Sequence, residues 1–340
     1  MPSIVARSAG VRCARRTGIG RPEARPIGRL IPFQRMNAVE ILNVSRTFGT
    51  VTAVDDLSLA VPEGSIYGFI GPNGSGKTTT MRMIVNIFYP DRGEIRIFGD
   101  GRPESSSDLI GYLPEERGLY QKMTVQAVLE FYGKLRSGRN TKSEVAQWLE
   151  RLGLASRAAD KVETLSKGMS QKVQFIATVI PEPKLLILDE PFSGLDPVSA
   201  EAIRDAILEL RRRGVTVILS THDMALAESL CDSIFMIFRG KKVLDGTLAS
   251  IQDRYGDDTI RVTTAGGLAA MGELPGVEQI RDLGQMQELR LARGADPQQV
   301  LRALVAQACV TSFTLTRPSL HDIFMRIAGP AAGEHNHAAL

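Results

Sequence analysis

The sequence predicts an α/β fold built on a parallel sheet, with an antiparallel β-subdomain, a helical insert and a small α+β module after it. Three observations carry this prediction. An apolar segment at 65–70 leads through a glycine-rich loop into a helical segment at 78–87. Two later apolar runs, at 185–188 and 215–219, are continuous, which is typical of strands buried on both faces of a parallel sheet. Between these parts, at 121–160, apolar residues recur with helical spacing.

The composition is that of an ordinary globular chain that is long enough to bury a large core. The 340 residues are 43% hydrophobic and 23% charged, and the net charge of +3 is too small to indicate a nucleic-acid partner. Three cysteines (Cys13, Cys231 and Cys309) do not make a disulfide framework, so we expect a reducing cytoplasm. No apolar run reaches the roughly 18 residues that span a bilayer. At a membrane, another chain would supply the span.

The first 36 residues differ in composition from the rest. Residues 1–35 hold eight arginines against one acid, Glu23, and show no helical or strand periodicity. We expect a disordered basic extension over 1–36, with Met36 as the real first residue, because Met36 directly precedes the first organised strand. An organellar transit peptide and a basic arm for acidic lipid or nucleic acid are the alternatives.

The segment at 37–63 predicts the antiparallel β-subdomain. Its apolar residues share faces at strand spacing: Val39, Ile41, Val44, Leu57, Leu59 and Val61. Such a period of two is typical of half-buried antiparallel strands. A further strand is expected at 94–98, after the turn at 90–93.

The glycine-rich loop fits the phosphate-loop pattern G-x-x-x-x-G-K-[ST], in the strand–loop–helix context that makes the match meaningful. Its residues are Gly71, Pro72, Asn73, Gly74, Ser75, Gly76, Lys77 and Thr78, followed by Thr79. The glycines allow backbone N–H groups to point at a phosphate chain, and the helix N-terminus adds its positive dipole end. We expect Lys77 to reach the β- and γ-phosphates of ATP and Thr78 to place its hydroxyl on Mg²⁺.

The apolar run at 185–188 ends in two adjacent carboxylates, Asp189 and Glu190. The C-terminal end of a buried parallel strand meets the crevice in which ligands bind. We therefore expect Asp189 to hold Mg²⁺, directly or through water. Glu190 is expected to orient or deprotonate the attacking water.

The predicted helical insert spans about 110–165. Within it, two successive segments carry apolar residues at helical spacing. Their members are Val125, Val128, Leu129 and Tyr132, then Val145, Trp148, Leu149 and Leu152. Gly138-Arg139-Asn140 separates them. Both stripes are interpreted as core, and Trp148 is given no cofactor.

From about 251 the pattern restarts and predicts a small α+β domain over 258–328. Strands are expected at 288–291 and 310–316, and helices after Asp296 and from Ser319. The sequence of this segment contains no group of residues that suggests catalysis or ligand binding. Residues 329–340 are expected to be a disordered tail, and its His335 and His337 are interpreted as solvated rather than metal-binding.

With these motifs, residues 38–247 resemble the nucleotide-binding subunits of ABC transporters. The segment 165–169, Leu-Ser-Lys-Gly-Met, stands where that family carries its signature sequence. Leu165, Ser166 and Gly168 keep the family pattern, and the third and fifth positions depart from it. The resemblance implies the P-loop NTPase fold of ABC type. It also implies that the signature residues meet the γ-phosphate of an ATP on the partner subunit.

Four further positions receive a role from the resemblance. Asp196 ends the sequence Ser-Gly-Leu-Asp, which matches the loop that joins the two sites across the dimer. His222 matches the histidine that contacts the γ-phosphate. Phe48 matches the aromatic residue on which adenine stacks, with core packing as the alternative. Glu115 stands where the family usually has a glutamine near Mg²⁺ or the attacking water. Our hypothesis is that Glu115 is the coupling residue, with a merely solvent-exposed side chain as the alternative.

The resemblance implies an ATP-hydrolysing subunit that pairs with a second copy, or a related subunit, around two ATP molecules. Such a pair drives a separate integral-membrane permease at the cytoplasmic face of the membrane, with no nucleic acid. The segments at 113–118, 165–169 and 318–324 resemble the ABC-2-type exporter branch, which includes sodium and drug extrusion. A soluble ABC ATPase acting on ribosomes or DNA is the alternative, although the chain has one phosphate loop and no long heptad insertion. A P-loop kinase or GTPase is a third class, and no Asn-Lys-x-Asp sequence is present.

Overall fold

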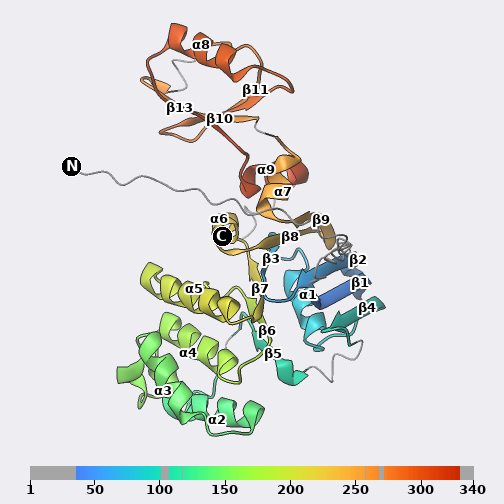
Figure 1. The fold of residues 1–340 in the computed structure, drawn as a ribbon, viewed down its shortest axis with the longest axis vertical. Helices are drawn as coiled ribbons and strands as arrows, with labels where there is room; N and C mark the ends of the chain where they lie inside the picture. The colour runs from blue at the N-terminus through green and yellow to red at the C-terminus, as the bar shows by residue number, and fades with distance from the viewer. Residues whose placement is uncertain (1–35, 101–106, 117, 257, 268–271, 330–340) are drawn as a thin grey trace, which may run out of the picture. The chain divides into compact units, whose positions relative to one another are not determined.

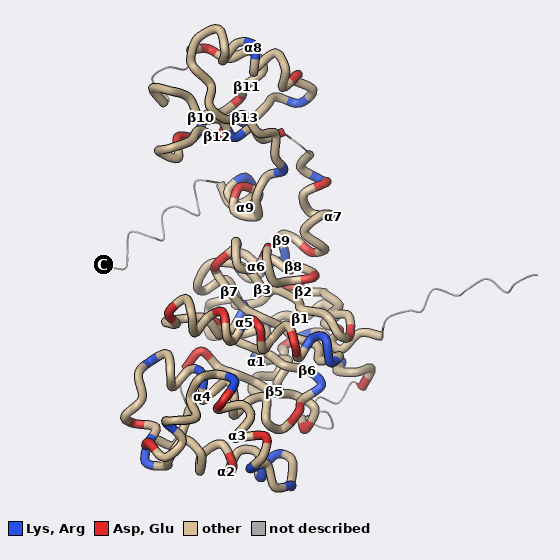
Figure 2. Tube along the Cα trace, turned by 60° about the vertical axis from the view of Figure 1, so that its left-hand side comes forward, with Lys and Arg blue, Asp and Glu red and all other residues tan. Residues whose placement is uncertain are grey.

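The computed structural model describes most of the chain, in five stretches: residues 36–100, 107–116, 118–256, 258–267 and 272–329 (Figure 1). All but the last residue of the predicted basic extension, and all but the first of the predicted tail, lie outside the described residues. Both stay predictions. Lys, Arg, Asp and Glu are interspersed through the described elements (Figure 2), in keeping with the small net charge. None of the described helices is both long and apolar enough to cross a membrane.

The main sheet has six strands in the order β5-β6-β7-β3-β8-β9. Their bounds are β3 (Ile66–Ile70), β5 (Ile110–Leu113), β6 (Leu185–Asp189), β7 (Thr216–Thr221), β8 (Ser233–Phe238) and β9 (Lys241–Gly246). The strands from β5 to β8 are parallel, and β9 pairs with β8 as an antiparallel edge. The parallel strands predicted at 65–70, 185–188 and 215–219 are confirmed. All three are buried along their whole length.

Two apolar cores form on opposite faces of the main sheet, because successive strand residues point to opposite sides. On one face Leu186, Leu188 and Leu219 pack in a core with residues of α5 (Pro197–Arg212) and of the helical insert. On the other face Phe69 and Ile187 pack in a core with residues of α1 (Lys77–Ile84) and of a second, three-stranded sheet. The sheet is therefore covered on both sides, as its continuous apolar strands require.

The three-stranded sheet has the order β2-β1-β4 and is antiparallel throughout, with β1 at Asn37–Phe48, β2 at Val51–Pro62 and β4 at Arg92–Ile97. It confirms the predicted antiparallel β-subdomain. A strict period of two would place Ile41 and Val44 on opposite faces. The register shifts between them, and Asn43 adopts φ 48°, so this bulge keeps both side chains in the core.

The helical insert contains α2 (Val125–Ser137), α3 (Lys142–Arg151) and α4 (Lys167–Val179). Gly138 ends α2 in the left-handed conformation at φ 69°, at the predicted break. Trp148 packs edge-on against Phe175, as expected for a core residue. The predicted range of about 110–165 is too wide at its start. Residues 110–113 form β5, which pairs with β6 in the main sheet.

The C-terminal residues form a second antiparallel sheet in the order β11-β12-β10-β13. Its strands are β10 (Thr259–Thr264), β11 (Val277–Asp282), β12 (Gln287–Leu291) and β13 (Val310–Thr316). Val300 and Leu304 of α8 (Pro297–Gln307) pack in one core with Ile260 and Leu289 of this sheet. The predicted strands at 288–291 and 310–316 and the helix after Asp296 are all present.

The last helix, α9 (Leu320–Ala328), packs against two parts of the chain. Its apolar residues Leu320, Ile323 and Phe324 belong to a core that contains Ile70, at the end of β3. That core also includes residues of α6 (Met224–Leu230) and α7 (Leu248–Asp253). On its charged side, Arg326 makes a two-point ion pair with Asp258, at 2.9 Å for each hydrogen bond. Periodicity predicted this helix but not its place in the core beside β3.

Candidate functional site

The phosphate loop connects β3 to α1, and two of its glycines are required by their surroundings. Gly71 has φ 154°, and a Cβ there would lie 2.2 Å from the backbone oxygen of Ile237. Gly76 has φ 111°, and a Cβ would lie 2.5 Å from the backbone oxygen of Ala53. No side chain fits at such distances. The loop therefore rests directly on the backbones of β8 and β2, as a tight backbone turn around an anion needs.

Lys77 is buried at the first position of α1, and its ammonium group turns back onto the loop. Nζ donates to the backbone oxygens of Gly71 and Pro72, at 2.7 and 3.1 Å. Burial lowers the pKa of Lys77, and the carboxylates of Glu190, Asp189 and Glu115 oppose that effect. The structure thus brings these three predicted carboxylates into the electrostatic environment of the lysine.

Asp189 is the last residue of β6, and Glu190 follows it, at the edge of the main sheet where β7 also ends. The Asp189 side chain is buried, and its Oδ1 accepts a hydrogen bond from the Ser220 hydroxyl at 2.6 Å. Its other oxygen, Oδ2, has no hydrogen-bond partner among the described residues. Glu190 adopts φ 48°, and its Oε1 lies 2.9 Å from Nδ1 of His222. The predicted acid pair and the predicted histidine therefore form one cluster.

The residues of this cluster fit a hard cation. A buried carboxylate oxygen without a partner is costly unless an ion or water satisfies it, and Asp189 Oδ2 is such an atom. Mg²⁺ prefers oxygen ligands and is commonly held by one or two protein oxygens together with substrate phosphates. In the described part of the chain, no three or more His, Cys, Asp or Glu residues are arranged as a complete metal site, so a cation here would also need oxygens of a bound phosphate. Thr78, at the second position of α1, is half-buried beside the loop.

The predicted signature segment and the Ser-Gly-Leu-Asp loop lie together at two helix starts. Ser166 caps α4, where its hydroxyl accepts from the Met169 N–H at 3.3 Å. Asp196 caps α5 by accepting from the N–H and the hydroxyl of Ser199, and these hydrogen bonds lower the pKa of Asp196. A Cβ on Gly168 would lie 3.6 Å from Leu195, an ordinary contact. Among the described residues of one copy, no contact requires glycine at position 168.

Phe48 is the last residue of β1 and is 39% exposed. It is therefore not packed in the core, which was the alternative interpretation of this residue. The Arg46 guanidinium lies 4.7 Å from the centre of its ring, and Phe88 meets the ring edge-on at 5.3 Å. The ring is thus held at the surface by two neighbours.

Glu115 is exposed in the loop after β5, as the alternative interpretation expects, and α4 holds the backbone around it. Gln174 Nε2 donates to the backbone oxygens of Pro114 and Glu116, at 3.5 and 3.2 Å. No local pattern in the sequence singles out Gln174, since it lies on a helix 60 residues after Pro114 (174 − 114). The loop that carries Glu115 is therefore tied to the helix that Ser166 caps.

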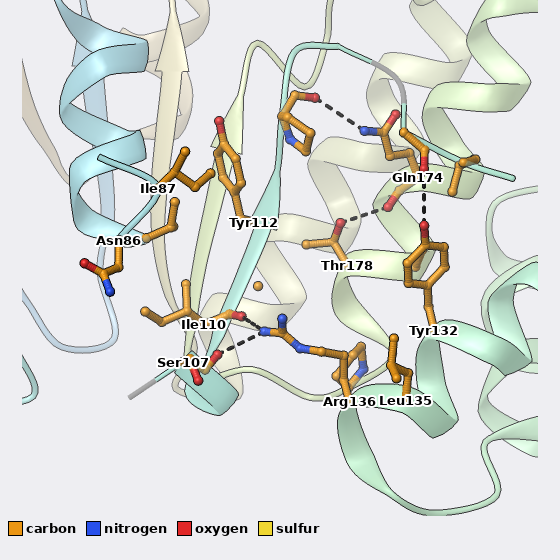
Figure 3. Close-up of a pocket in the computed structure, with 17 residues that line it drawn as sticks. Asn86, Ile87, Ser107, Ile110, Tyr112, Tyr132, Leu135, Arg136, Gln174 and Thr178 are labelled. Atoms are coloured by element: carbon orange, nitrogen blue, oxygen red, sulfur yellow. Dashed lines mark hydrogen bonds between the residues drawn. The ribbon is translucent and has the colours of Figure 1, made fainter. Parts of the chain in front are cut away.

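A pocket of about 640 Å³ opens beside this loop (Figure 3). Within it Arg136 of α2 donates to the backbone oxygens of Ser107 and Ile110, and Tyr132 donates to that of Gly118. Several large apolar side chains are exposed on the segments that form it: Ile87, Tyr89, Tyr120, Phe131 and Leu135. Of these, Ile87 and Leu135 line the pocket. Ile87 and Leu135 thus give the pocket two exposed apolar side chains.

Comparison with known proteins adds to this geometry. The family model described as ABC transporter matches residues 54–193, and one for the C-terminal domain of DrrA1-3-like ATP-binding proteins matches 246–328. The uncharacterized ABC transporter ATP-binding protein YhaQ of Bacillus subtilis is 39% identical over 84% of this chain and 97% of its own. The Nod factor export ATP-binding protein I of Rhizobium sp. (strain N33) is 33% identical over 86% of this chain and 97% of its own. A solved ATP-binding subunit of an ABC transporter, 32% identical, matches with a TM-score of 0.61 over 64% of this chain and 93% of that one.

Proposed function

The chain belongs to the ATP-binding subunits of ABC transporters, a family of ATPases, and from this premise we propose that two copies enclose two ATP molecules and drive a membrane permease. One observation carries the proposal. The ends of β3, β6 and β7 bring four side chains together: Lys77, Asp189, Glu190 and His222. A phosphate-binding lysine and a carboxylate that can activate water therefore share one site. Export is the proposed direction, since one relative is named for Nod factor export.

Within each copy we assign the phosphate chain of ATP to the loop at 71–79. Lys77 exchanges its two carbonyl partners for oxygens of the β- and γ-phosphates. Thr78 and Asp189, with Glu115 nearby, would hold Mg²⁺, which supplies positive charge against the phosphates when it is bound. The adenine stacks on Phe48, which lies at the surface with its ring held by Arg46 and Phe88.

Glu190 is the proposed general base. It orients the attacking water and accepts its proton, and the hydrogen bond with His222 Nδ1 at 2.9 Å fixes where its carboxylate lies. A neutral imidazole carries one N–H. If Nδ1 donates to Glu190, Nε2 donates to a γ-phosphate oxygen only in the protonated ring. His222 thus links the water-activating acid to the arrival of the γ-phosphate.

The site of one copy is completed by the signature segment of the other. Leu165, Ser166 and Gly168 stand at the start of α4, where free N–H groups attract a phosphate. Since no contact among the described residues calls for glycine at 168, we assign its lack of a side chain to a close approach of the second copy. Asp196 supports the same surface by capping α5 beside Gly168.

The permease is proposed to bind at the pocket beside Glu115. Exposed Ile87 and Leu135 give this surface the apolar character of a protein contact. Through Gln174, the Glu115 loop is joined to the helix that begins at the signature segment. A conformational change at the ATP site is thereby transmitted to the surface that binds the permease. Through this contact the chain would sit at the cytoplasmic face of the membrane, without nucleic acid.

The test is a glutamine variant of the proposed base. Glu190→Gln should bind ATP and Mg²⁺, hydrolyse ATP at least about 100-fold more slowly, and accumulate as a dimer in size-exclusion chromatography with light scattering. Lys77→Ala is the matched control, which should neither hydrolyse ATP nor dimerise with it. A monomeric, fully active Glu190→Gln variant would contradict the assignment. Association of the wild type with ribosomes or DNA, in place of a membrane protein, would favour the soluble alternative.

A further inference from the structure

Ser220 lies at the centre of the hydrogen bonds that connect β6 to β7 beside the proposed site. It is fully buried on β7, directly opposite Asp189 in the sheet register. Its hydroxyl donates to Asp189 Oδ1 at 2.6 Å and accepts from the Glu190 backbone N–H at 2.9 Å. One side chain therefore contacts both members of the acid pair.

The first bond determines which oxygen of Asp189 is available. A serine hydroxyl has a single proton to donate, so the short contact directs that proton at Oδ1. The carboxylate plane is then fixed, and Oδ2 stays buried without a partner among the described residues. Without this bond the Asp189 carboxylate could rotate, and neither oxygen would be held in a fixed position.

The second bond holds the backbone of Glu190 in an uncommon conformation. Glu190 has φ 48°, in the left-handed region that residues other than glycine, asparagine and aspartate rarely adopt. Its N–H is held by Ser220, and its carbonyl oxygen accepts from the Ser193 N–H at 3.1 Å. These two bonds direct the Glu190 side chain toward His222, which is two residues beyond Ser220 on the same strand end.

We propose that Ser220 is a positioning residue, which presents Asp189 Oδ2 to Mg²⁺ and holds Glu190 where it meets the attacking water. Ser220 is fully buried, and its hydroxyl already donates to Asp189 and accepts from Glu190, so it acts through these two residues. The proposal rests on the roles proposed above for Asp189 and Glu190. Hydrogen-bond partners of metal ligands typically change metal affinity or activity by about 10- to 100-fold when they are removed.

The experiment compares Ser220→Ala and Ser220→Cys with Ser220→Thr, which keeps the hydroxyl. Thr216→Val is the matched control, because Thr216 is a buried hydroxyl on the same strand that binds the Gly64 N–H, away from the acid pair. ATP turnover is measured against Mg²⁺ concentration. ATP affinity with and without Mg²⁺ is measured separately by calorimetry, and folding by thermal unfolding.

Ser220→Ala should raise the half-saturating Mg²⁺ concentration and lower turnover, each by about 10- to 100-fold, and should abolish most of the gain in ATP affinity that Mg²⁺ gives. Ser220→Thr should stay near the wild type, and Thr216→Val should keep its Mg²⁺ dependence. If Ser220→Ala does not fold, Ser220→Cys gives the same comparison with a weak donor. Wild-type Mg²⁺ dependence in a folded Ala or Cys variant would overturn the role of Ser220 alone. Failure of the wild type to respond to Mg²⁺ would overturn the proposed site itself.

Discussion

Substituting Gly168 by alanine should separate the stability of one copy from the assembly of two. The new methyl group meets Leu195 at 3.6 Å, an ordinary contact, and α4 accepts alanine at this position without a left-handed backbone. Removing a glycine from a helix reduces the freedom of the unfolded chain, which stabilises the protein by about 0.4–1 kcal/mol. A single copy should therefore unfold about 1–3 °C higher than the wild type.

Assembly should respond in the opposite direction. In the proposed dimer the same methyl group stands between the α4 backbone and a phosphate of the partner's ATP. A displacement of about 1 Å at such a contact costs on the order of 100-fold in rate. The assay pairs thermal unfolding with ATP turnover and with light scattering of the Gly168→Ala, Glu190→Gln double variant. Gly111→Ala gives the contrast, since its methyl would lie 2.9 Å from the Thr178 backbone oxygen and should lower the unfolding temperature. A Gly168→Ala chain that turns over ATP like the wild type would refute the reasoning.

Two further predictions concern the core. Burial raises the pKa of Cys231 to about 12, from an ordinary value near 9. Between these two values the unfolded thiol loses its proton while the folded chain keeps it. The free energy of unfolding should therefore fall as the pH rises above about 9. Iodoacetamide at pH 8 should accordingly label exposed Cys309 before Cys231, as mass spectrometry of tryptic peptides can check, and equal rates would contradict this burial. Phe324→Ala should cost about 3–5 kcal/mol in urea unfolding, because Phe324 is 7% exposed and meets Phe238 edge-on at 5.8 Å. A cost below about 1 kcal/mol would show that α9 does not belong to the core beside β3.

Periodicity predicted the main parallel strands because their apolar runs leave little choice of structure. The strand at 110–113 has only four residues, Ile-Gly-Tyr-Leu, and one of these is glycine, which is depleted in strands. Its assignment to the main sheet depends on β6, 75 residues later in the register (185 − 110), which no local pattern reveals. Likewise the bulge at Asn43 is a backbone event, visible beforehand only as an odd spacing between Ile41 and Val44.

The charged residues of the proposed site could be predicted from the sequence. The residues that position them by hydrogen bonds were harder to predict. Lys77, Asp189 and Glu190 stand in motifs whose spacing reflects their chemistry. Gln174 and Ser220 each make two hydrogen bonds to a distant segment, and their neighbours in the sequence carry no trace of those contacts. A hydroxyl at the end of an apolar run, two residues before His222, was the one available signal for Ser220.

The packing of α9 also bears on the order in which the chain can fold. The core that contains Ile70 is completed by Phe324, which closes a loop of 254 residues (324 − 70). Contacts so distant in sequence form late, because the chain entropy lost in closing the loop precedes any gain from burial. During synthesis the strand that leads into the phosphate loop leaves the ribosome long before α9 does. Until then the apolar surface around Ile70 stays exposed, and a nascent chain at this stage is a candidate for chaperone binding.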